Sequence, residues 1–97
     1  MKITVKYFAA LREIVGKRED LLELDSDLTV ENLLKILSNK YGREFQDYIY
    51  DKEDRIRENL QFLVDGKNIS TAKGIRTKLH DSSQFVIIPP VGGGFVD

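Results

Sequence analysis

The last predicted strand of this chain runs directly into its tail in the stretch Phe85-Val86-Ile87-Ile88-Pro89-Pro90-Val91-Gly92-Gly93-Gly94. Residues 85 to 88 form a continuous apolar run rich in β-branched side chains, which predicts a central strand covered on both faces. The two prolines fix φ and remove backbone donors, so we expect the chain to leave the sheet stiffly. The three glycines lack Cβ atoms and can enter a channel too narrow for side chains. This order favours a tip that enters a partner's active site, although an ordinary frayed terminus is the alternative.

The composition is that of one globular domain. The chain has 97 residues, of which 41% are apolar and 32% charged, and this is enough for one modest core but too little for a second domain. We therefore expect a folded domain over residues 1–91 and a flexible Gly-rich tail over residues 92–97.

Charge and composition exclude several classes of function. The net charge of −1 gives no overall attraction to nucleic acid. The absence of cysteine excludes disulfides, thiolate nucleophiles and Cys-based zinc sites. The one histidine, His80, adjoins Asp81 in a polar segment, which is typical of a solvated residue rather than a catalytic pair. The sequence shows neither the pattern of a leader peptide nor a membrane-spanning run, so we expect a cytoplasmic protein. With no cysteine and a single histidine, we also expect no metal site.

The first third of the chain predicts two strands. Ile3, Val5 and Tyr7 alternate with polar residues, as in a strand with one buried face. Residues 11–16 predict a short helix that stops at a glycine, and residues 20–24 predict a second strand, antiparallel to the first.

The strongest helix signal begins at Thr29, whose hydroxyl can cap the first turn. Apolar residues then recur at helical spacing as far as Tyr41, and Gly42 supplies the stop. Such a helix must lie across a sheet. Residues 43–58 predict a short helix followed by an exposed loop.

A hairpin follows over residues 60–69, because Asp65-Gly66 matches the positive φ angles of a type I′ turn. The predicted order of elements is thus β-β-α-β-β-β. We expect an α+β fold of the β-grasp type, with one main helix packed on one face of a mixed four- or five-stranded sheet. In this arrangement the first and last strands are adjacent and parallel at the centre.

Four segments together carry a family resemblance: Phe8-Ala9-Ala10-Leu11-Arg12-Glu13, Thr29-Val30-Glu31-Asn32-Leu33-Leu34, Leu63-Val64-Asp65-Gly66 and Ile88-Pro89-Pro90-Val91-Gly92-Gly93-Gly94. In these segments it resembles the MoaD-like small subunit of molybdopterin synthase, a branch of the sulfur-carrier, ubiquitin-like family. The segments are spread along the chain, so the match extends over nearly its whole length. The thiamin-pathway sulfur carriers are similar but shorter, and residues 43–58 make the longer branch the better match.

The resemblance implies a carrier that is at most a non-catalytic subunit and binds no cofactor of its own. In the family, an E1-like enzyme uses ATP to adenylate the carboxylate of the terminal glycine, which is then converted to a thiocarboxylate. In this branch the sulfur passes to the large subunit of molybdopterin synthase, which builds the dithiolene of molybdopterin. Matched residue by residue, the terminal glycine pair falls on Gly93 and Gly94.

This sequence departs from the pattern after Gly94. Phe95, Val96 and Asp97 follow, so the free carboxylate belongs to a residue that a channel shaped for glycine should reject. The chain is therefore inert toward adenylation until the Gly94–Phe95 bond is cut, and with no cysteine and one histidine it has no evident means of cutting it. Some family members carry such extensions and lose them to a JAMM-type metalloprotease, and the resemblance implies a similar precursor here. The alternative is a degenerate relative that never carries sulfur.

The resemblance also implies a partner-binding surface around the tail, made of Phe8, Arg12, Ile88, Pro90, Val91 and Gly92. The planar guanidinium of Arg12 can hold a partner carboxylate by two bonds. For Phe8 and Ile88, simple core packing is an equally open interpretation, because apolar residues on strands are usually inside.

Three functions remain open at this point. The first is sulfur carriage for molybdopterin or tungstopterin synthesis. The second is a protein modifier, in which the activated Gly94 is joined to lysines of other proteins or serves tRNA thiolation. The third is a noncovalent binding module that is never processed. The sequence does not choose among the acceptors, because an acceptor reads a surface rather than a catalytic motif.

Overall fold

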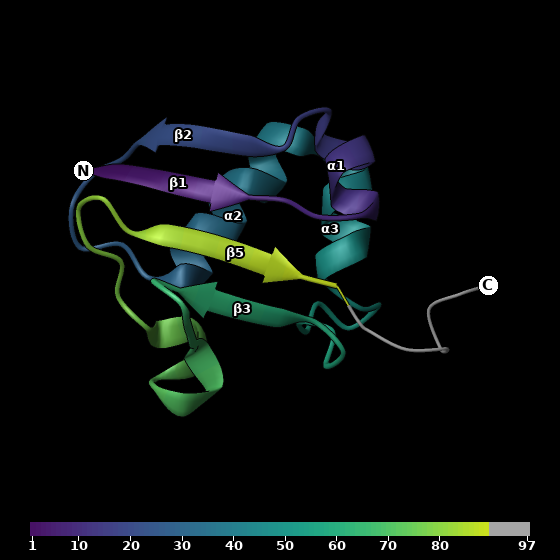
Figure 1. Ribbon diagram of the computed structural model, residues 1–97. Helices are drawn as coiled ribbons and strands as arrows, with labels where there is room; N and C mark the ends of the chain where they lie inside the picture. The colour runs from purple at the N-terminus through teal and green to yellow at the C-terminus, as the bar shows by residue number, and fades with distance from the viewer. Residues whose placement is uncertain (90–97) are drawn as a thin grey trace.

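The computed structural model describes residues 1–89. Five strands, three α-helices and two 3-10 turns make up this part of the chain (Figure 1). In chain order they are β1 (Lys2–Lys6), α1 (Ala10–Val15), β2 (Glu19–Glu23), α2 (Val30–Tyr41), α3 (Arg43–Ile49), β3 (Gln61–Val64), β4 (Lys67–Asn68), η1 (Ile69–Thr71), η2 (Gly74–Arg76) and β5 (Gln84–Ile88).

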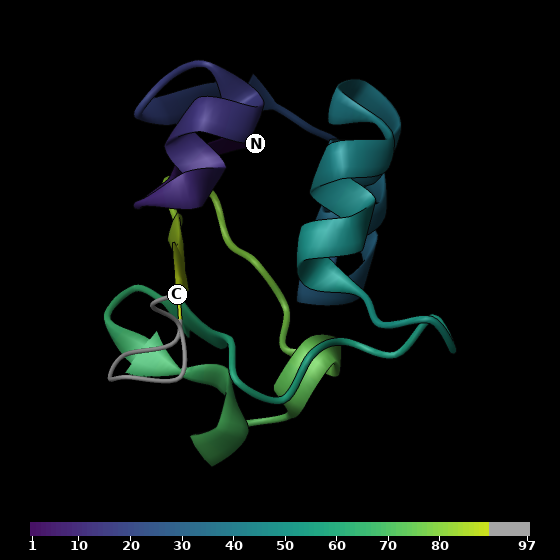
Figure 2. The ribbon, with the colours of Figure 1, turned by 90° about the vertical axis from the view of Figure 1, so that its right-hand side faces the viewer.

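The strands form one mixed sheet in the order β2-β1-β5-β3-β4. β1 and β5 run parallel at its centre, and every other neighbouring pair is antiparallel. The predicted adjacency of the first and last strands is therefore confirmed. Figure 2 shows α2 and α3 on one face of the sheet. This is the expected α+β, β-grasp arrangement, with α1 and α3 added to the main helix.

α2 begins as predicted, with Thr29 as its N-cap. The Thr29 hydroxyl accepts a hydrogen bond of 3.2 Å from the backbone N–H of Asn32, whose side-chain oxygen accepts one of 3.0 Å from the Thr29 N–H. This reciprocal capping box satisfies two amide donors of the first turn. The helix then buries four apolar residues against the sheet, namely Val30, Leu33, Leu34 and Leu37.

The β3–β4 hairpin is also confirmed. Asp65 has φ 52° and Gly66 has φ 84°, the two positive angles that a type I′ turn requires. The turn places Leu63 opposite Asn68 and Val64 opposite Lys67.

The prediction that residues 85 to 88 are covered on both faces is wrong. Phe85 and Ile87 are fully buried, whereas Val86 and Ile88 are only half-buried. Since α2 and α3 cover one face of the sheet, only every second residue of β5 enters the core. The four residues lack polar alternation because the open face of β5 is itself apolar.

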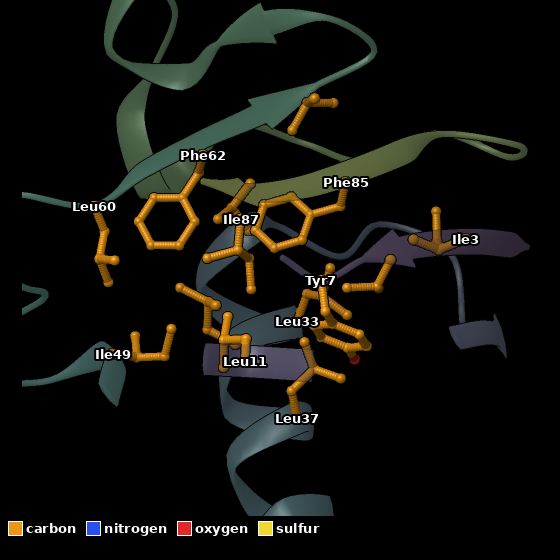
Figure 3. Packing of buried hydrophobic residues seen from close by; sticks show 14 of the residues in the cluster. Ile3, Tyr7, Leu11, Leu33, Leu37, Ile49, Leu60, Phe62, Phe85 and Ile87 are labelled. Atoms are coloured by element: carbon orange, nitrogen blue, oxygen red, sulfur yellow. The ribbon is translucent and has the colours of Figure 1, made fainter. Parts of the chain in front are cut away.

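The core lies between the sheet and the helices. The rings of Phe62 and Phe85 are stacked there, with centroids 5.8 Å apart and nearly parallel planes, and Figure 3 shows both rings among the buried side chains. Among residues 1–89, no helix has both the length and the apolar character needed to cross a membrane.

Candidate functional site

β1 and β5 finish at the same side of the sheet. They run parallel with Lys6 beside Val86, so β1 ends at Lys6 and β5 ends two residues past Val86, at Ile88, with both strands pointing the same way (Figure 1). Pro89, the last described residue, follows Ile88. We call this region the tail end of the sheet, and it consists of Phe8, Arg12, Ile88 and Pro89.

Phe8 is one of two large apolar side chains exposed in the described part of the chain, with 36% of its surface accessible. The guanidinium carbon of Arg12 lies 5.2 Å from the centre of the Phe8 ring, in cation–π geometry. The Arg12 Nε–H also donates a hydrogen bond of 2.9 Å to the carbonyl of Tyr7. Arg12 therefore fixes the exposed ring from one side while its two terminal nitrogens make no hydrogen bond to residues 1–89.

The backbone between these two residues is strained. Ala9, the N-cap of α1, has φ 53° and ψ −130°. Glycine adopts this conformation far more readily than a residue with a side chain does. Strain of this kind persists only where the surroundings enforce it, and it is found preferentially at functional sites. Here it turns the chain from β1 into α1 and directs Phe8 outward.

The open face of the sheet continues the apolar surface. Leu63 lies opposite Val86 in the β3–β5 ladder, and Ile88 follows Val86 on the same face. All three side chains are half-buried. We call Leu63, Val86 and Ile88 the open-face patch. Sequence reasoning missed Leu63 and Val86 as surface residues, although their alternation with buried Phe62 and Phe85 was a usable signal.

A carboxylate lies buried beside the end of β1. Asp20 of β2 is 4% exposed. One of its oxygens accepts hydrogen bonds from the hydroxyl of Tyr7, at 2.7 Å, and from the hydroxyl of Tyr41. The other lies 3.0 Å from Lys17 Nζ and 3.7 Å from Lys40 Nζ. This cluster, which sequence reasoning also missed, joins β2, the end of β1 and the end of α2.

The surroundings of Asp20 favour its charged form. Burial alone would raise the pKa of Asp20, but the hydrogen bonds from Tyr41, Tyr7 and Lys17 outweigh it and hold this pKa below its ordinary value. Burial, followed by the hydrogen bond to Asp20, raises the pKa of Tyr7 far above its ordinary range. Asp20 is thus an anion and Tyr7 a neutral donor throughout the physiological range.

The described residues also form a hollow away from the tail end. This hollow, of about 1090 Å³, lies along α2, α3 and the following loop and is lined by mixed charges such as Glu31, Lys35, Arg43 and Asp47. Within residues 1–89, no three His, Cys, Asp or Glu side chains gather in a way that would hold a metal ion.

The predicted site residues fall into two groups. Phe8, Arg12 and Ile88 lie at the tail end, where Phe8 is exposed and the other two are half-buried. The remaining ones lie outside the described residues, as does the predicted domain boundary after residue 91; they are Pro90, Val91, Gly92, Gly93, Gly94 and Phe95. Their roles stay predictions.

Known proteins support the resemblance over nearly the whole chain. The ThiS family matches residues 5–94. Small archaeal modifier protein 3 of Haloferax volcanii is 30% identical, over 97% of this chain and 100% of that protein. The molybdopterin synthase sulfur carrier subunit of Caenorhabditis briggsae is 26% identical, over 97% of this chain and 99% of that protein.

Solved structures agree with this assignment. The solution structure of small archaeal modifier protein 1 from Methanosarcina acetivorans superposes with a TM-score of 0.79 at 34% identity, covering 96% of each chain. Fold, sequence motifs and the extent of the family match therefore lead to one conclusion: this chain belongs to the ThiS family of β-grasp proteins.

Proposed function

We propose that this protein is a ubiquitin-like sulfur carrier whose working end is Gly94, exposed as a carboxylate after Phe95, Val96 and Asp97 are removed. One observation carries the proposal. The match to the ThiS family runs to residue 94 and stops there, so it includes the glycines and leaves out the three-residue extension. In the sequence, the proposed working end lies six residues beyond Ile88, the last residue of β5.

The proposed chemistry has three steps. A protease, of the JAMM type by resemblance, adds water across the Gly94–Phe95 amide and releases a tripeptide. The new carboxylate attacks the α-phosphorus of ATP in an E1-like partner, displaces pyrophosphate and forms an acyl adenylate. Hydrosulfide then attacks the acyl carbon and expels AMP, which leaves a thiocarboxylate. Adenylation is needed because a carboxylate is a poor acyl electrophile, whereas AMP is a good leaving group.

For the acceptor we propose the large subunit of molybdopterin synthase. The relative from Caenorhabditis briggsae is named a molybdopterin synthase sulfur carrier subunit and aligns over 97% of this chain. The open-face patch and Phe8 provide an apolar surface around the base of the tail, which suits a partner that takes the tail into its active site.

A second candidate function is favoured by a different relative. Small archaeal modifier protein 3 aligns over its whole length at 30% identity. In this role a lysine amine of a target protein would attack the carbonyl carbon of the Gly94 acyl adenylate, expel AMP, lose a proton to water and form an isopeptide bond. The carrier and modifier functions share the activation step and differ only in the nucleophile that follows.

The activation step can be tested directly with the E1-like enzyme of the native host, ATP and Mg²⁺. The chain ending at Gly94 should release pyrophosphate, and the full chain ending at Asp97 should not. A chain ending at Gly94 but carrying Gly94→Val is the control for passage through the channel. Failure of the 1–94 chain to release pyrophosphate would leave the noncovalent binding module as the better explanation.

The acceptor is then decided by adding either the large synthase subunit with the pterin precursor or a mixture of host proteins. Sulfur transfer to the pterin would support the carrier function. Lysine-linked conjugates that disappear when Gly94 is deleted would support the modifier.

A further inference from the structure

The Asp20 cluster connects a buried charge to the exposed tail end through one residue, Tyr7. The Tyr7 hydroxyl donates a hydrogen bond of 2.7 Å to Asp20. Its backbone N–H donates to the carbonyl of Arg18 at 2.9 Å, and its own carbonyl accepts from Arg12 Nε, also at 2.9 Å. Tyr7 is fully buried, so its ring and both of its backbone polar groups are held in place.

Arg12 depends on this arrangement for its position. Its Nε–H is bound to the Tyr7 carbonyl, and its guanidinium carbon lies 5.2 Å from the centre of the Phe8 ring. A shift of the Tyr7 backbone would therefore move Arg12 and, with it, the exposed ring. The strained Ala9, which joins Phe8 to α1, leaves this segment few other conformations.

Stability alone does not account for a buried carboxylate here. Taking an ion out of water carries a large penalty, and buried ionic groups are often replaced by apolar residues at no loss of stability. In return, charged hydrogen bonds fix direction and distance more tightly than apolar contacts do. The cluster gathers groups from positions 7, 17, 20, 40 and 41. Lys17 and Lys40 reach solvent directly, and among the described residues Tyr7 is the member that bonds to Arg12.

We infer that Asp20 is a positioning residue for partner binding: it fixes Tyr7, and thereby holds Arg12 and Phe8 in the geometry that a partner recognises. The inference rests on the proposed function, because the position of this pair matters only if a partner contacts it. Neither Asp20 nor Tyr7 touches the partner or the reacting carboxylate in this account.

Two variants test the inference, and a third is the matched control. Asp20→Asn weakens the anchor, and Tyr7→Phe keeps the ring but removes its hydroxyl. Tyr41→Phe removes the other hydroxyl bound to the same carboxylate oxygen but has no hydrogen bond to the tail end. A merely structural cluster would make Tyr7→Phe and Tyr41→Phe equivalent at the tail end.

The first readout does not depend on function. Nuclear magnetic resonance follows the Nε–H proton of Arg12 and the ring protons of Phe8 in the full chain. In Asp20→Asn and Tyr7→Phe, the Arg12 proton should exchange with water at least about tenfold faster, because its acceptor is no longer fixed. The contacts between Arg12 and the Phe8 ring should weaken. In Tyr41→Phe both should stay as in the unchanged chain.

The second readout is pyrophosphate release by the E1-like enzyme with chains ending at Gly94. A positioning defect should raise KM about tenfold and leave kcat unchanged, since it removes binding energy but does not touch the carboxylate. If Tyr7→Phe and Tyr41→Phe have the same KM and the same Arg12 exchange rate, the inference is overturned. If even the unchanged 1–94 chain is not adenylated, the proposed function fails, and the resonance data alone decide whether Asp20 positions the pair.

Discussion

Leu63 of β3 and Val86 of β5 lie directly opposite each other on the face of the sheet turned away from α2. Both are half-buried, while their neighbours Phe62 and Phe85 stack in the core. An antiparallel pair of this kind brings two apolar side chains together on a surface. With Ile88 next on the same face, the patch leads toward the point where the tail begins.

Leu63→Asp should abolish most partner binding and leave the fold intact. A charge at the centre of an apolar interface loses its hydration on binding, so affinity for the large synthase subunit should fall at least about tenfold. Isothermal titration calorimetry measures this. Asn39→Asp, which adds the same charge at an exposed position of α2, is the control, and equal losses in both variants would indicate a general charge effect.

Phe8→Ala should separate binding from stability. Because Phe8 is 36% exposed, its removal should lower the free energy of unfolding by about 1–2 kcal/mol, whereas Phe62→Ala in the core should lower it by about 3–5 kcal/mol. Urea denaturation gives both values. Binding of the E1-like enzyme should weaken in the folded Phe8→Ala variant, and a large loss of stability there would mean that Phe8 is a core residue after all.

Ala9→Gly should stabilise the protein. The backbone angles of Ala9, φ 53° and ψ −130°, cost an L-residue roughly 1–3 kcal/mol, while glycine adopts them freely but loses about 0.5–1 kcal/mol of chain entropy. A net gain of about 1 kcal/mol is therefore expected by urea denaturation. The neighbouring Ala10→Gly, in ordinary helical conformation, should instead destabilise, and a loss in both variants would argue against strain at Ala9.

Asp20→Asn should change how stability depends on pH. The pKa of Asp20 is lower in the folded state than in the unfolded chain, so its contribution is complete above the ordinary aspartate value of about 3.9 and is lost as pH falls through the folded value. The variant should be less stable by roughly 2–3 kcal/mol at pH 7. The difference in the free energy of unfolding between the variant and the unchanged protein should narrow as pH falls below about 4. It should vanish once Asp20 is protonated in the folded state. A stability difference that stays constant into strong acid would contradict the lowered pKa of Asp20 in the folded state.

The parts of the fold that follow from local pattern could be predicted from the sequence. Thr29 and Gly42 bound the main helix because capping depends on residues three or four apart, and Asp65-Gly66 sets the hairpin because a tight turn depends on its own backbone angles. The tail-end position of Phe8 followed from a family resemblance rather than from pattern.

The Asp20 cluster could not be predicted in this way. Its members Tyr7, Asp20 and Tyr41 are far apart in the sequence and meet only when β1, β2 and α2 pack together. Nor could the strain at Ala9, since alanine carries no local signal for a positive φ angle. Both features depend on tertiary packing, which overrides local preference.

The proposed sulfur-carrier function depends most directly on whether Gly94 becomes the end of the chain. The measurement that tests this is the intact mass of the protein purified from its native host. We predict a species that ends at Gly94, together with a form heavier by the replacement of one oxygen with sulfur. If every molecule still ends at Asp97 while the host is making molybdopterin, the sulfur-carrier proposal is contradicted.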